Sequence, residues 1–424
     1  MTSTDVTAAA RRSPHHSGGP CRSCGAELRL VVTDLGMSPP CEDWLPADRI
    51  NTAETFYPLV VWACETCWLV QIQDYMPVTE IFDEYGYFSS FSDSWLDHCR
   101  DDAHTQIERL GLGPDSLVVE VASNDGYFLR WFVERGVPVL GVEPARNVAA
   151  VAVERGVPTR VEYFGVETAR AMVAEGLRAD LLAGKNVMAQ VPDLNDFVGG
   201  MAVLLAPDGV ITIEFPHLQR LIEGNQFDTI YHEHFSYFSL IATEALFERN
   251  GLRIFDVEEL WTHGGSLRIH ACHADHERPT ADAVAELRDR EIALGYASPA
   301  AYAAFDEQVQ ATKRGLLRAL IELREQGLRV AGYGAAGKGM TMLNYCGIRT
   351  DLVEFISDRN PYKHGRFCPG VHIPIQPPEA IDEARPDVVL ILPWNFRDEI
   401  VAQLAHIRDW GGRFLVAVPE TELF

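Results

Sequence analysis

The segment Tyr231-His-Glu-His-Phe-Ser-Tyr-Phe-Ser239 gathers side chains that can move a proton. Two histidines, one acid and two tyrosines lie within seven residues. A histidine with a pKa near neutrality suits the removal of a proton beside a carbonyl, so the segment predicts general base catalysis. Metal ligation is less favoured, since no other clear ligand set lies nearby and histidines two positions apart on a helix point in different directions. A buried His–Glu pair with a structural role is the remaining alternative.

Two Cys-x-x-Cys pairs, Cys21-Arg-Ser-Cys24 and Cys64-Glu-Thr-Cys67, predict a zinc site. They are separated by 39 residues and supply the four soft thiolates that a tetrahedral zinc ion takes. Four protein ligands leave no open position for water, so the zinc is expected to be structural. Four buried free cysteines and a regulatory disulfide pair are the alternatives.

The stretch Leu117-Val-Val-Glu-Val-Ala-Ser-Asn-Asp-Gly126 is typical of a strand that passes through a small polar turn into a helix. Ser123 and Gly126 leave room for a cofactor beside the backbone, and the helix N-terminus offers unpaired N–H groups. Glu143 ends the next strand, where an acid accepts hydrogen bonds from ribose hydroxyls. Because the turn does not follow Gly-x-Gly-x-x-Gly, the pattern favours S-adenosylmethionine over a dinucleotide. An ordinary strand, turn and helix is the alternative.

A second glycine-rich turn, Gly332-Tyr-Gly-Ala-Ala-Gly-Lys-Gly339, lies between a predicted strand and the helical Met340–Tyr345. Its backbone N–H groups and Lys338 suit a diphosphate, and the missing Lys-Ser/Thr ending argues against ATP hydrolysis. A purely structural glycine turn is the alternative. The side chains expected near a base or ribose follow the next strands and are Asp358, Lys363, His364, Trp394 and Asn395.

The composition is that of a soluble protein with two or three domains. The chain has 424 residues, of which 47% are hydrophobic and 23% charged, and no apolar run approaches the length of a membrane span. Its net charge of −25 repels nucleic acid. Residues 1–20 lack the apolar core of a secretory signal, and the paired cysteines suit a reducing compartment. We therefore expect a cytoplasmic protein whose partners include neither nucleic acid nor a membrane.

These motifs fall into successive segments of an α/β protein. Residues 1–19 are expected to form a disordered tail, and residues 20–75 a zinc-ribbon-like module. Residues 76–275 alternate strands and helices, which predicts a parallel sheet covered on both faces. Residues 276–326 indicate a helical connector, and residues 327–424 half of a doubly wound domain. The predicted strands are Leu28–Val32 and Leu59–Ala63 in the first module; Leu117–Val121, Val137–Val142, Asn186–Gln190, Gly209–Phe215, Arg253–Leu260 and Ser266–Ala271 in the second; and Arg329–Tyr333, Leu352–Ser357 and Val388–Leu392 in the last.

Seven motifs together point to one known family. They are the double Cys-x-x-Cys motif, Tyr85-Gly-Tyr87-Phe-Ser-Ser90, Glu120-Val-Ala-Ser-Asn-Asp-Gly126, Gly141-Val-Glu143-Pro144, Tyr231-His-Glu-His234, His263-Gly-Gly-Ser-Leu-Arg268 and Gly332-Tyr-Gly-Ala-Ala-Gly-Lys338. Over nearly everything after residue 20, the chain resembles the sugar C-methyltransferases, which modify dTDP-linked 4-keto-deoxysugars for antibiotic glycosides. The resemblance implies an N-terminal zinc module, a central Rossmann-like class I methyltransferase domain and a C-terminal doubly wound α/β domain that binds the nucleotide-sugar. A monomer is expected.

The resemblance also implies a reaction. The C4 carbonyl of the sugar acidifies the C3 hydrogen, a base removes it, and the enolate carbon takes the methyl group of S-adenosylmethionine. His234 is then the base, Glu233 orients or tunes it, and Tyr231 or Tyr85 donates a hydrogen bond to the enolate oxygen. The implied cofactor-binding residues are Glu120, Ala122, Asn124, Asp125, Gly126, Glu143, Pro144, Asn186 and Gln190. The implied substrate-binding residues are Tyr87, Ser90, His263, Arg268, Tyr333, Gly334, Ala335, Lys338, Asn344, Asp358, Lys363, Trp394 and Asn395.

Two positions depart from the family pattern. Position 190 carries Gln where the family often has a histidine, and an amide cannot act as a base, although it can donate and accept hydrogen bonds. Two alternatives to methylation therefore stay open: a C3 epimerisation that consumes no cofactor, and a non-catalytic relative that only binds a nucleotide-sugar. The Pro39-Pro40-Cys41 stretch also departs from the pattern, and we expect that change to affect only the surface of the zinc module.

Overall fold

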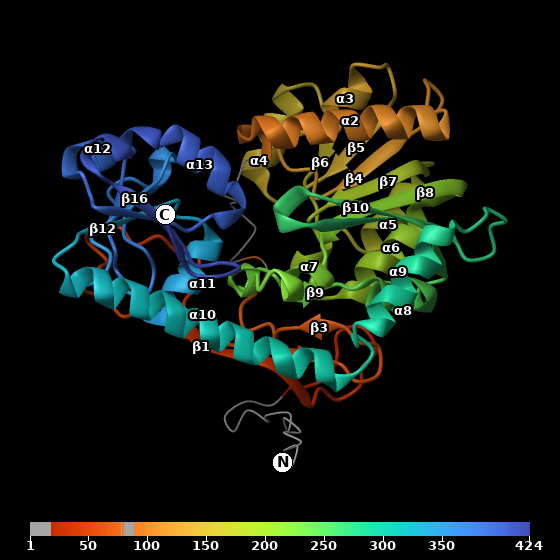
Figure 1. Cartoon of the computed structure of the whole chain (residues 1–424). Coiled ribbons are helices and arrows are strands. Elements are labelled where there is room, and N and C mark those ends of the chain that lie inside the picture. Colours follow the sequence, from red (N-terminus) through yellow and green to blue (C-terminus); the bar gives the residue numbers. More distant parts are fainter. Residues whose placement is uncertain (1–17, 78, 80–88) are drawn as a thin grey trace, which may run out of the picture.

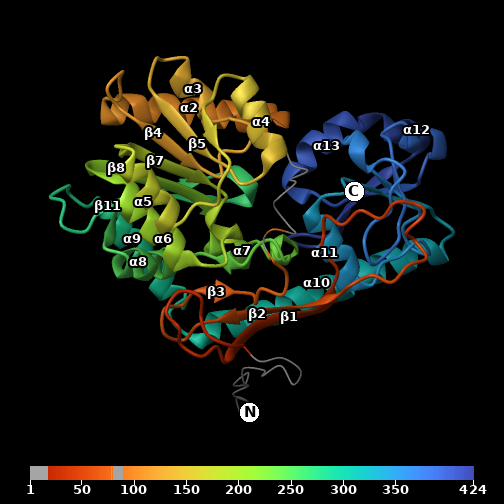
Figure 2. The ribbon, with the colours of Figure 1, turned by 180° about the vertical axis from the view of Figure 1, so that it is seen from behind.

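The computed structural model describes residues 18–77, 79 and 89–424. Tyr85, Tyr87 and nearly all of the predicted tail lie outside the described residues. Three sheets organise the described chain. The seven-stranded and six-stranded sheets lie in separate lobes, and the four-stranded sheet lies below them beside the long helix α10 (Pro299–Glu325), as Figures 1 and 2 show. None of the helices in this part of the chain has an apolar stretch of membrane-spanning length.

The first sheet is antiparallel and joins the N-terminal module to the middle of the chain. Its strands, in spatial order, are β1 (Leu30–Ser38), β2 (Tyr57–Ala63), β3 (Val70–Gln71) and β9 (Ser236–Tyr237). The predicted strands at Leu28–Val32 and Leu59–Ala63 fall on β1 and β2. The fourth strand, β9, begins two residues after His234 and pairs with β3. The predicted zinc module and the candidate base are therefore tied to one sheet.

The inner strand β2 of this sheet is buried on both faces. Successive side chains of a strand point to opposite faces, and in β2 Leu59 and Val61 enter a core shared with α10 and the C-terminal sheet. Val60 and Trp62 enter the core of the second sheet instead. All four side chains are at most 3% exposed. The N-terminal module thus packs against both lobes at once.

The second sheet has seven strands in the order β10-β11-β8-β7-β4-β5-β6, and β11 alone is antiparallel to its neighbours. The direction of winding reverses between β4 and β7, which is where ligands bind in open α/β sheets. The strands are β4 (Val118–Val121), β5 (Val139–Val142), β6 (Thr159–Arg160), β7 (Ala179–Lys185), β8 (Leu205–Pro216), β10 (Leu252–Leu260) and β11 (Ser266–His273).

Helices cover both faces of this sheet, as the alternating pattern predicted (Figure 1). One face carries α2 (Asp93–Leu110), α3 (Arg130–Val133) and α4 (Arg146–Glu154). The other carries α5 (Val166–Ala174), α6 (Leu194–Leu204), α8 (Leu240–Arg249) and α9 (Asp282–Ala293). The short α7 (Leu218–Glu223) precedes the segment that contains His234.

One predicted strand, Asn186–Gln190, is wrong. The fourth parallel strand is β7, which ends at Lys185, and Met188–Gln190 forms a 3₁₀ turn. Asn186 has a positive φ of 57°, which ends the strand. The sequence of β7, Ala-Asp-Leu-Leu-Ala-Gly-Lys, contains no β-branched residue, so its strand character comes from burial between two neighbouring strands rather than from propensity.

The third sheet has six strands in the order β14-β13-β12-β15-β16-β17, and β17 alone is antiparallel. The predicted strands Arg329–Tyr333 and Val388–Leu392 coincide with β12 and β15, whereas Leu352–Ser357 shortens to β13. The strands are β12 (Val330–Tyr333), β13 (Ile356–Ser357), β14 (Ile375–Gln376), β15 (Val388–Ile391), β16 (Arg413–Val416) and β17 (Glu422–Leu423), and the helices are α11 (Gly337–Cys346), α12 (Ala380–Ala384) and α13 (Arg397–Gln403).

The predicted connector is helical, but α10 is also a structural part of the core. Its buried face belongs to the same core as β1 and the third sheet. Tyr302 stacks on Trp68 of the N-terminal module with ring centroids 6.3 Å apart, and Asp306 accepts a 2.9 Å hydrogen bond from Thr33. Near its other end α10 contacts α11, whose Thr341 hydroxyl donates to the carbonyl of Ile230 at 2.8 Å. These contacts fix α11 beside the segment that carries His234.

Candidate active site

A cavity of about 540 Å³ opens where the second sheet, the 231–235 turn and the N-terminus of α11 meet. It brings together residues from three segments that are far apart in the sequence. The sequence-predicted residues that line it are Ala122, Asn124, Glu143, Pro144, Asn186, Gln190, Tyr231, Glu233, His234, His263, Lys338 and Asn395. The cavity therefore collects candidates for the cofactor, the catalytic and the substrate sites in one place.

The backbone around this cavity is strained. Ala122, Asn124, Asn186 and His263 all line it, and all have positive φ values, of 54°, 48°, 57° and 54°. Such conformations are uncommon outside glycine and persist only where the surroundings enforce them, which happens most often at functional sites. Ala122 and Asn124 shape the turn after β4, Asn186 ends β7, and His263 projects from the turn before β11.

Glu143 holds the turn after β4 in place. Its carboxylate accepts hydrogen bonds from the backbone N–H of Asn124 at 2.9 Å and of Ala145 at 2.8 Å. Burial raises the pKa of Glu143, and these two donors oppose that rise. Each carboxylate oxygen can accept one further bond on the cavity side, which fits a pair of ribose hydroxyls. The Asn186 Oδ1 atom is buried, has no hydrogen-bond partner among the described residues and offers another acceptor.

Three predicted cofactor residues, Glu120, Asp125 and Gly126, do not line the cavity. Glu120 is fully buried on β4, and this burial raises the pKa of its carboxyl well above the ordinary range. Asp125 is ion-paired with Arg155 at 2.9 Å and accepts a hydrogen bond from the Ser90 hydroxyl. Gly126 has a φ of 78° and packs against Val157. These residues support the turn, and Ser90, predicted to bind substrate, belongs to the same group.

His234 is arranged as a neutral imidazole with a free nitrogen. Its Nδ1 lies 3.0 Å from the carbonyl oxygen of Thr229, so Nδ1 carries the proton and donates it, and Nε2 keeps its lone pair. Burial lowers the pKa of His234 to about 4. Its ring lies against the ring of Tyr231, with the two planes tilted by 34° and the centroids 4.1 Å apart. Thr229 thus provides the orienting contact that the resemblance assigns to Glu233.

The pKa of Glu233 is shifted in the opposite direction from that of His234. Burial, together with the charge of Glu42, raises the pKa of Glu233 to about 8. The thiol of Cys41 lies 3.5 Å from its Oε1. Cys41 is only 3% exposed, so the expectation that this stretch affects only the surface of the zinc module is wrong. The loop of the module instead reaches into the site and contacts a candidate catalytic carboxyl.

The neighbouring histidine, His232, faces away from this cavity. Its Nε2 lies 3.2 Å from the carbonyl oxygen of Pro58, at the start of β2. Because the 231–235 segment is a turn and not a helix, the two histidines diverge along different walls. The described residues contain one group that could hold a metal ion, and it is the four cysteines, not this segment.

His263 and Lys338 complete the cavity wall. The Asn186 amide lies 2.9 Å from His263 Nε2, and burial, with the nearby charge of Lys338, lowers the pKa of His263 to about 4. Lys338 donates to Asn395 Oδ1 at 3.2 Å and lies over the ring of Trp394, 4.7 Å from its centroid. Burial lowers the pKa of Lys338. The charge of Lys338 therefore acts on both His234 and His263.

Several predicted substrate residues lie outside the cavity. Asp358 caps the glycine-rich turn, because its carboxylate accepts from the N–H groups of Ala335 at 2.6 Å and Asn360 at 2.7 Å. Lys363 donates to the Ala335 carbonyl at 2.7 Å. Asn344 bonds to the carbonyls of Met340 and Pro369. The members of the predicted set that do not line the cavity are Ser90, Arg268, Tyr333, Gly334, Ala335, Asn344, Asp358, Lys363 and Trp394, whereas Tyr87, like Tyr85, lies outside the described residues.

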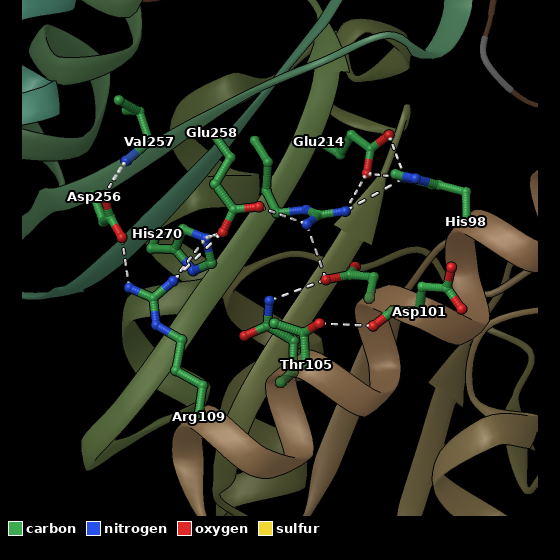
Figure 3. Close-up of polar contacts among 12 residues, drawn as sticks. His98, Asp101, Thr105, Arg109, Glu214, Asp256, Val257, Glu258 and His270 are labelled. Carbon is green, nitrogen blue, oxygen red and sulfur yellow. Dashed lines mark hydrogen bonds and ion pairs between the residues drawn. The ribbon is translucent and has the colours of Figure 1, made fainter.

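Arg268 instead belongs to a buried ionic network behind the cavity. Its guanidinium pairs with Asp102 and Glu214 at 3.1 Å each, and with Glu258 at 2.9 Å. Lys185 pairs with the first two of these carboxylates at 2.5 and 3.0 Å. Figure 3 shows the part of the network around Glu214 and Glu258. Burial opposes the ionisation of Glu214, but its cationic neighbours hold its pKa well below the usual range.

This network supports the turn that carries His263. The Thr262 hydroxyl donates to Glu214 Oε1 at 3.0 Å, and His98 lies 2.9 Å from the other oxygen. Sequence reasoning missed Lys185, which both lines the cavity and anchors the network. The predicted strand, Asn186–Gln190, begins one residue after Lys185, so Lys185 was not expected to lie on a strand. Glu42, Cys41 and Thr229 were also missed.

The four paired cysteines meet as predicted. Their Sγ atoms all lie within 4.8 Å of one another, with Cys21 and Cys67 at 3.6 Å and Cys24 and Cys64 at 3.5 Å. Gln71 Nε2 donates to Cys21 Sγ at 3.1 Å, which suits a thiolate. Four sulfur ligands without an open position fit a structural zinc ion. None of the four lines the cavity.

Two features define the class of this protein. One is the strand order of the second sheet, in which the antiparallel β11 lies beside β8, and the other is the cavity at the point where the winding reverses. The protein is an S-adenosylmethionine-dependent methyltransferase of the class I fold, with a four-cysteine zinc site. Family models match a zinc binding domain over residues 21–82, a methyltransferase domain over residues 96–257 and a C-methyltransferase C-terminal domain over residues 261–419.

The chain belongs to the C-methyltransferase family. It is 38% identical to the C-methyltransferase NovU of Streptomyces niveus over 403 residues, which cover 94% of this chain and 95% of the relative. This confirms the resemblance that the seven motifs indicated. Among solved structures, magnesium protoporphyrin IX methyltransferase of Synechocystis PCC 6803 with bound S-adenosylmethionine is similar, at 14% identity and a TM-score of 0.33, over 43% of this chain and 82% of that one. A methyltransferase of Clostridium acetobutylicum has 11% identity and a TM-score of 0.35, over 43% and 93%.

Proposed function

We propose that the protein methylates C3 of a dTDP-linked 4-keto-deoxysugar. The observation that supports this most directly is the pairing of two groups with opposite pKa shifts in one cavity. At neutral pH His234 is an unprotonated imidazole, and Glu233 is largely a protonated acid. Neighbouring groups whose pKa values are pushed apart in this way serve as base and acid. When a proton beside a carbonyl is removed, the base accepts that proton and the acid donates a hydrogen bond to the carbonyl oxygen.

In the proposed reaction His234 Nε2 takes the C3 proton. The electrons of the broken C–H bond form the C3–C4 double bond, and negative charge moves to the C4 oxygen. Hydrogen-bond donors aimed at that oxygen lower the barrier. We assign this role to Glu233 in its protonated form and to the Tyr231 hydroxyl, which both line the cavity. Thr229 keeps His234 in the required tautomer throughout.

The cofactor end of the cavity has the acceptors that this chemistry requires. The turn of Ala122 and Asn124, the carboxylate of Glu143 and the orphaned Oδ1 of Asn186 would hold the ribose and the amino acid part of the ligand. S-adenosylmethionine, when bound, supplies an electrophilic methyl group to the carbon nucleophile. Gln190 lines the same region, where its amide can donate and accept hydrogen bonds without acting as a base.

Mass spectrometry of purified protein with S-adenosylmethionine and a panel of dTDP-4-keto-deoxysugars tests this proposal. We expect a product heavier by one methyl group, and we expect His234→Ala to reduce kcat by about a hundredfold or more, the usual contribution of a general base. His406→Ala is the control, because His406 is exposed, pairs with Asp382 and contacts the ring of Trp410, and does not line the cavity. Unchanged sugar masses across the panel contradict the proposal. Deuterium uptake from solvent without cofactor consumption would instead support the epimerisation.

A further inference from the structure

The loop that follows β1 in the N-terminal module is attached to the structure at both of its ends. Before the loop, β1 pairs with β2. After it, Leu45 and Phe367 exchange backbone hydrogen bonds of 3.0 and 2.8 Å, and the Leu45 side chain is fully buried. The loop therefore joins the zinc module to the C-terminal lobe, and the residues between these two anchors are held in a defined place.

Cys41 lies in this loop and packs against the first turn of α11. A Cβ atom added to Gly337 would lie 3.2 Å from the Cys41 sulfur and 3.6 Å from the nearest atom of the Tyr231 ring. These distances leave little room for a side chain at position 337, which lines the cavity. The thiol, the start of α11 and the Tyr231 ring thus form one closely packed group at the cavity wall.

Among the described residues, the Glu233 carboxyl has one hydrogen-bond partner, the thiol of Cys41. Burial raises the pKa of this thiol well above its ordinary value, so the sulfur keeps its proton and acts as the donor. Its acceptor is Glu233 Oε1, at 3.5 Å. In a protonated carboxyl the oxygen that accepts is the carbonyl oxygen, and the other oxygen carries the proton. The contact therefore assigns the acid proton to Oε2.

Two charged side chains also act on Glu233, but neither fixes its orientation. The carboxylate of Glu42, next to Cys41 in the loop, raises the pKa of Glu233, and the ammonium of Lys363, in the segment after β13, lowers it. Within the described part of the chain, neither group is hydrogen-bonded to Glu233, and Lys363 donates to the Ala335 carbonyl instead. These two groups change how readily Glu233 ionises, whereas Cys41 selects one of its two oxygens.

We propose that Cys41 is a positioning residue that keeps the acid proton of Glu233 on Oε2, from which it donates a hydrogen bond to the C4 oxygen of the sugar. This inference rests on the proposed function. It gives the acid the kind of control that Thr229 gives the base, because Thr229 occupies Nδ1 of His234 and leaves Nε2 for the substrate. The zinc module thus acts on the reaction through Glu233.

The pH dependence of kcat and KM in Cys41→Ala and Cys41→Ser tests this role. Glu233 should lose its proton at about pH 8, which lowers kcat/KM at alkaline pH. Cys41→Ala removes a donor that stabilises the charged form, so we expect this decline to move upward by about half a pH unit to one unit. We expect kcat to fall by about three- to tenfold with KM nearly unchanged. Cys41→Ser keeps a donor and should retain the kcat and the pH profile of the unchanged protein.

The matched control is Cys368→Ala. Cys368 is buried in the same core as Cys41, does not line the cavity, and its thiol has no hydrogen-bond partner among the described residues. The change removes the same volume as Cys41→Ala, so we expect an unshifted pH profile. S-adenosylmethionine affinity, measured on every variant, shows that each one folds.

The infrared S–H stretch of the full-length, zinc-loaded protein tests the contact without any turnover. The band that disappears in Cys41→Ser belongs to this thiol. As the pH rises from about 6 to 10, Glu233 Oε1 becomes part of a carboxylate, which is a stronger acceptor than a neutral carboxyl. We therefore expect the band to move to lower frequency over this range, and to stay in place in Glu233→Gln. This comparison decides the matter even where Cys41→Ala fails to fold.

Three outcomes overturn the inference. They are an S–H band that does not respond to pH, an unshifted alkaline decline in Cys41→Ala, and equal changes in Cys41→Ala and Cys41→Ser. Failure of the proposed function has a different signature. In that case the S–H band of Cys41 still follows the ionisation of Glu233, but no sugar in the panel gains a methyl group.

Discussion

At the scale of single residues, the candidate chemistry depends on how two neighbours in the sequence are buried. Glu233 and His234 are adjacent, yet Glu233 is hydrogen-bonded to the thiol of Cys41, whereas His234 is hydrogen-bonded to the backbone carbonyl of Thr229. The sequence predicted both residues because their types are suggestive. It could not predict Cys41 as a partner of Glu233, since the two lie 192 positions apart and nothing local signals the contact.

The opposite pKa shifts predict a bell-shaped pH profile for kcat/KM. The acid limb should lie at about pH 4, below which His234 is protonated and cannot accept a proton, and the alkaline limb at about pH 8, above which Glu233 loses its proton. Glu233→Gln keeps a donor but cannot titrate, so its profile should lose the alkaline limb. Steady-state rates from about pH 3 to 10 measure this. An alkaline limb that persists in Glu233→Gln would assign it to another group, such as Lys338.

At the scale of elements, the strained turns after β4 and β7 and before β11 all end at the same cavity. Most strands were predictable from their apolar runs, and the four predicted zinc ligands meet. The position of β7 in the sequence was not predictable, because a strand that is buried between two neighbouring strands needs no β-branched residues. The same error hid Lys185, whose ion pairs join β7 to α2 and β8.

Replacing Lys185 tests how much this network stabilises the fold. Lys185→Met leaves Asp102 and Glu214 buried with one cation fewer, so we expect a loss of about 3–5 kcal/mol in the free energy of unfolding. Urea denaturation followed by tryptophan fluorescence measures it. Both carboxylates have lowered pKa values in the folded protein, so the stabilisation is present above their unfolded pKa, near about 4, and is lost as the pH falls through the folded values.

The control is Arg314→Met, which removes an exposed pair with Glu307 and should leave the urea midpoint nearly unchanged. Equal midpoints for Lys185→Met and the unchanged protein would show that the network contributes little to stability.

At the scale of the whole molecule, the zinc module lies below the two lobes and packs against both of them. The fold class was predictable segment by segment from the alternation of strands and helices. The packing was not, because β9 joins the first sheet from a position 165 residues beyond β3, and such pairing leaves no local pattern. The sequence divides the chain into consecutive parts, whereas the cores combine residues from all of them.

Removing zinc should therefore abolish methyl transfer more than cofactor binding. Without the metal, β1, β2 and β3 lose their anchor, and β9 and the turn of His234 lose their support. The turn after β4, which Glu143 holds, stays intact. We expect chelation, or Cys64→Ser, to reduce turnover by about a hundredfold or more and S-adenosylmethionine affinity by only a few fold. Cys272→Ser, in a cysteine that is not part of the four-cysteine group, is the control, and parallel loss of both properties would contradict the expectation.

The burial of β2 on both faces has a mechanical consequence. A lobe that swings about a hinge must break the contacts on its side, and here Leu59 and Val61 hold one lobe while Val60 and Trp62 hold the other. Rotating the lobes apart would expose this apolar surface to water, at a cost that rises with its area. We therefore expect the spacing between the lobes to be set when the chain folds and to change little when ligands bind.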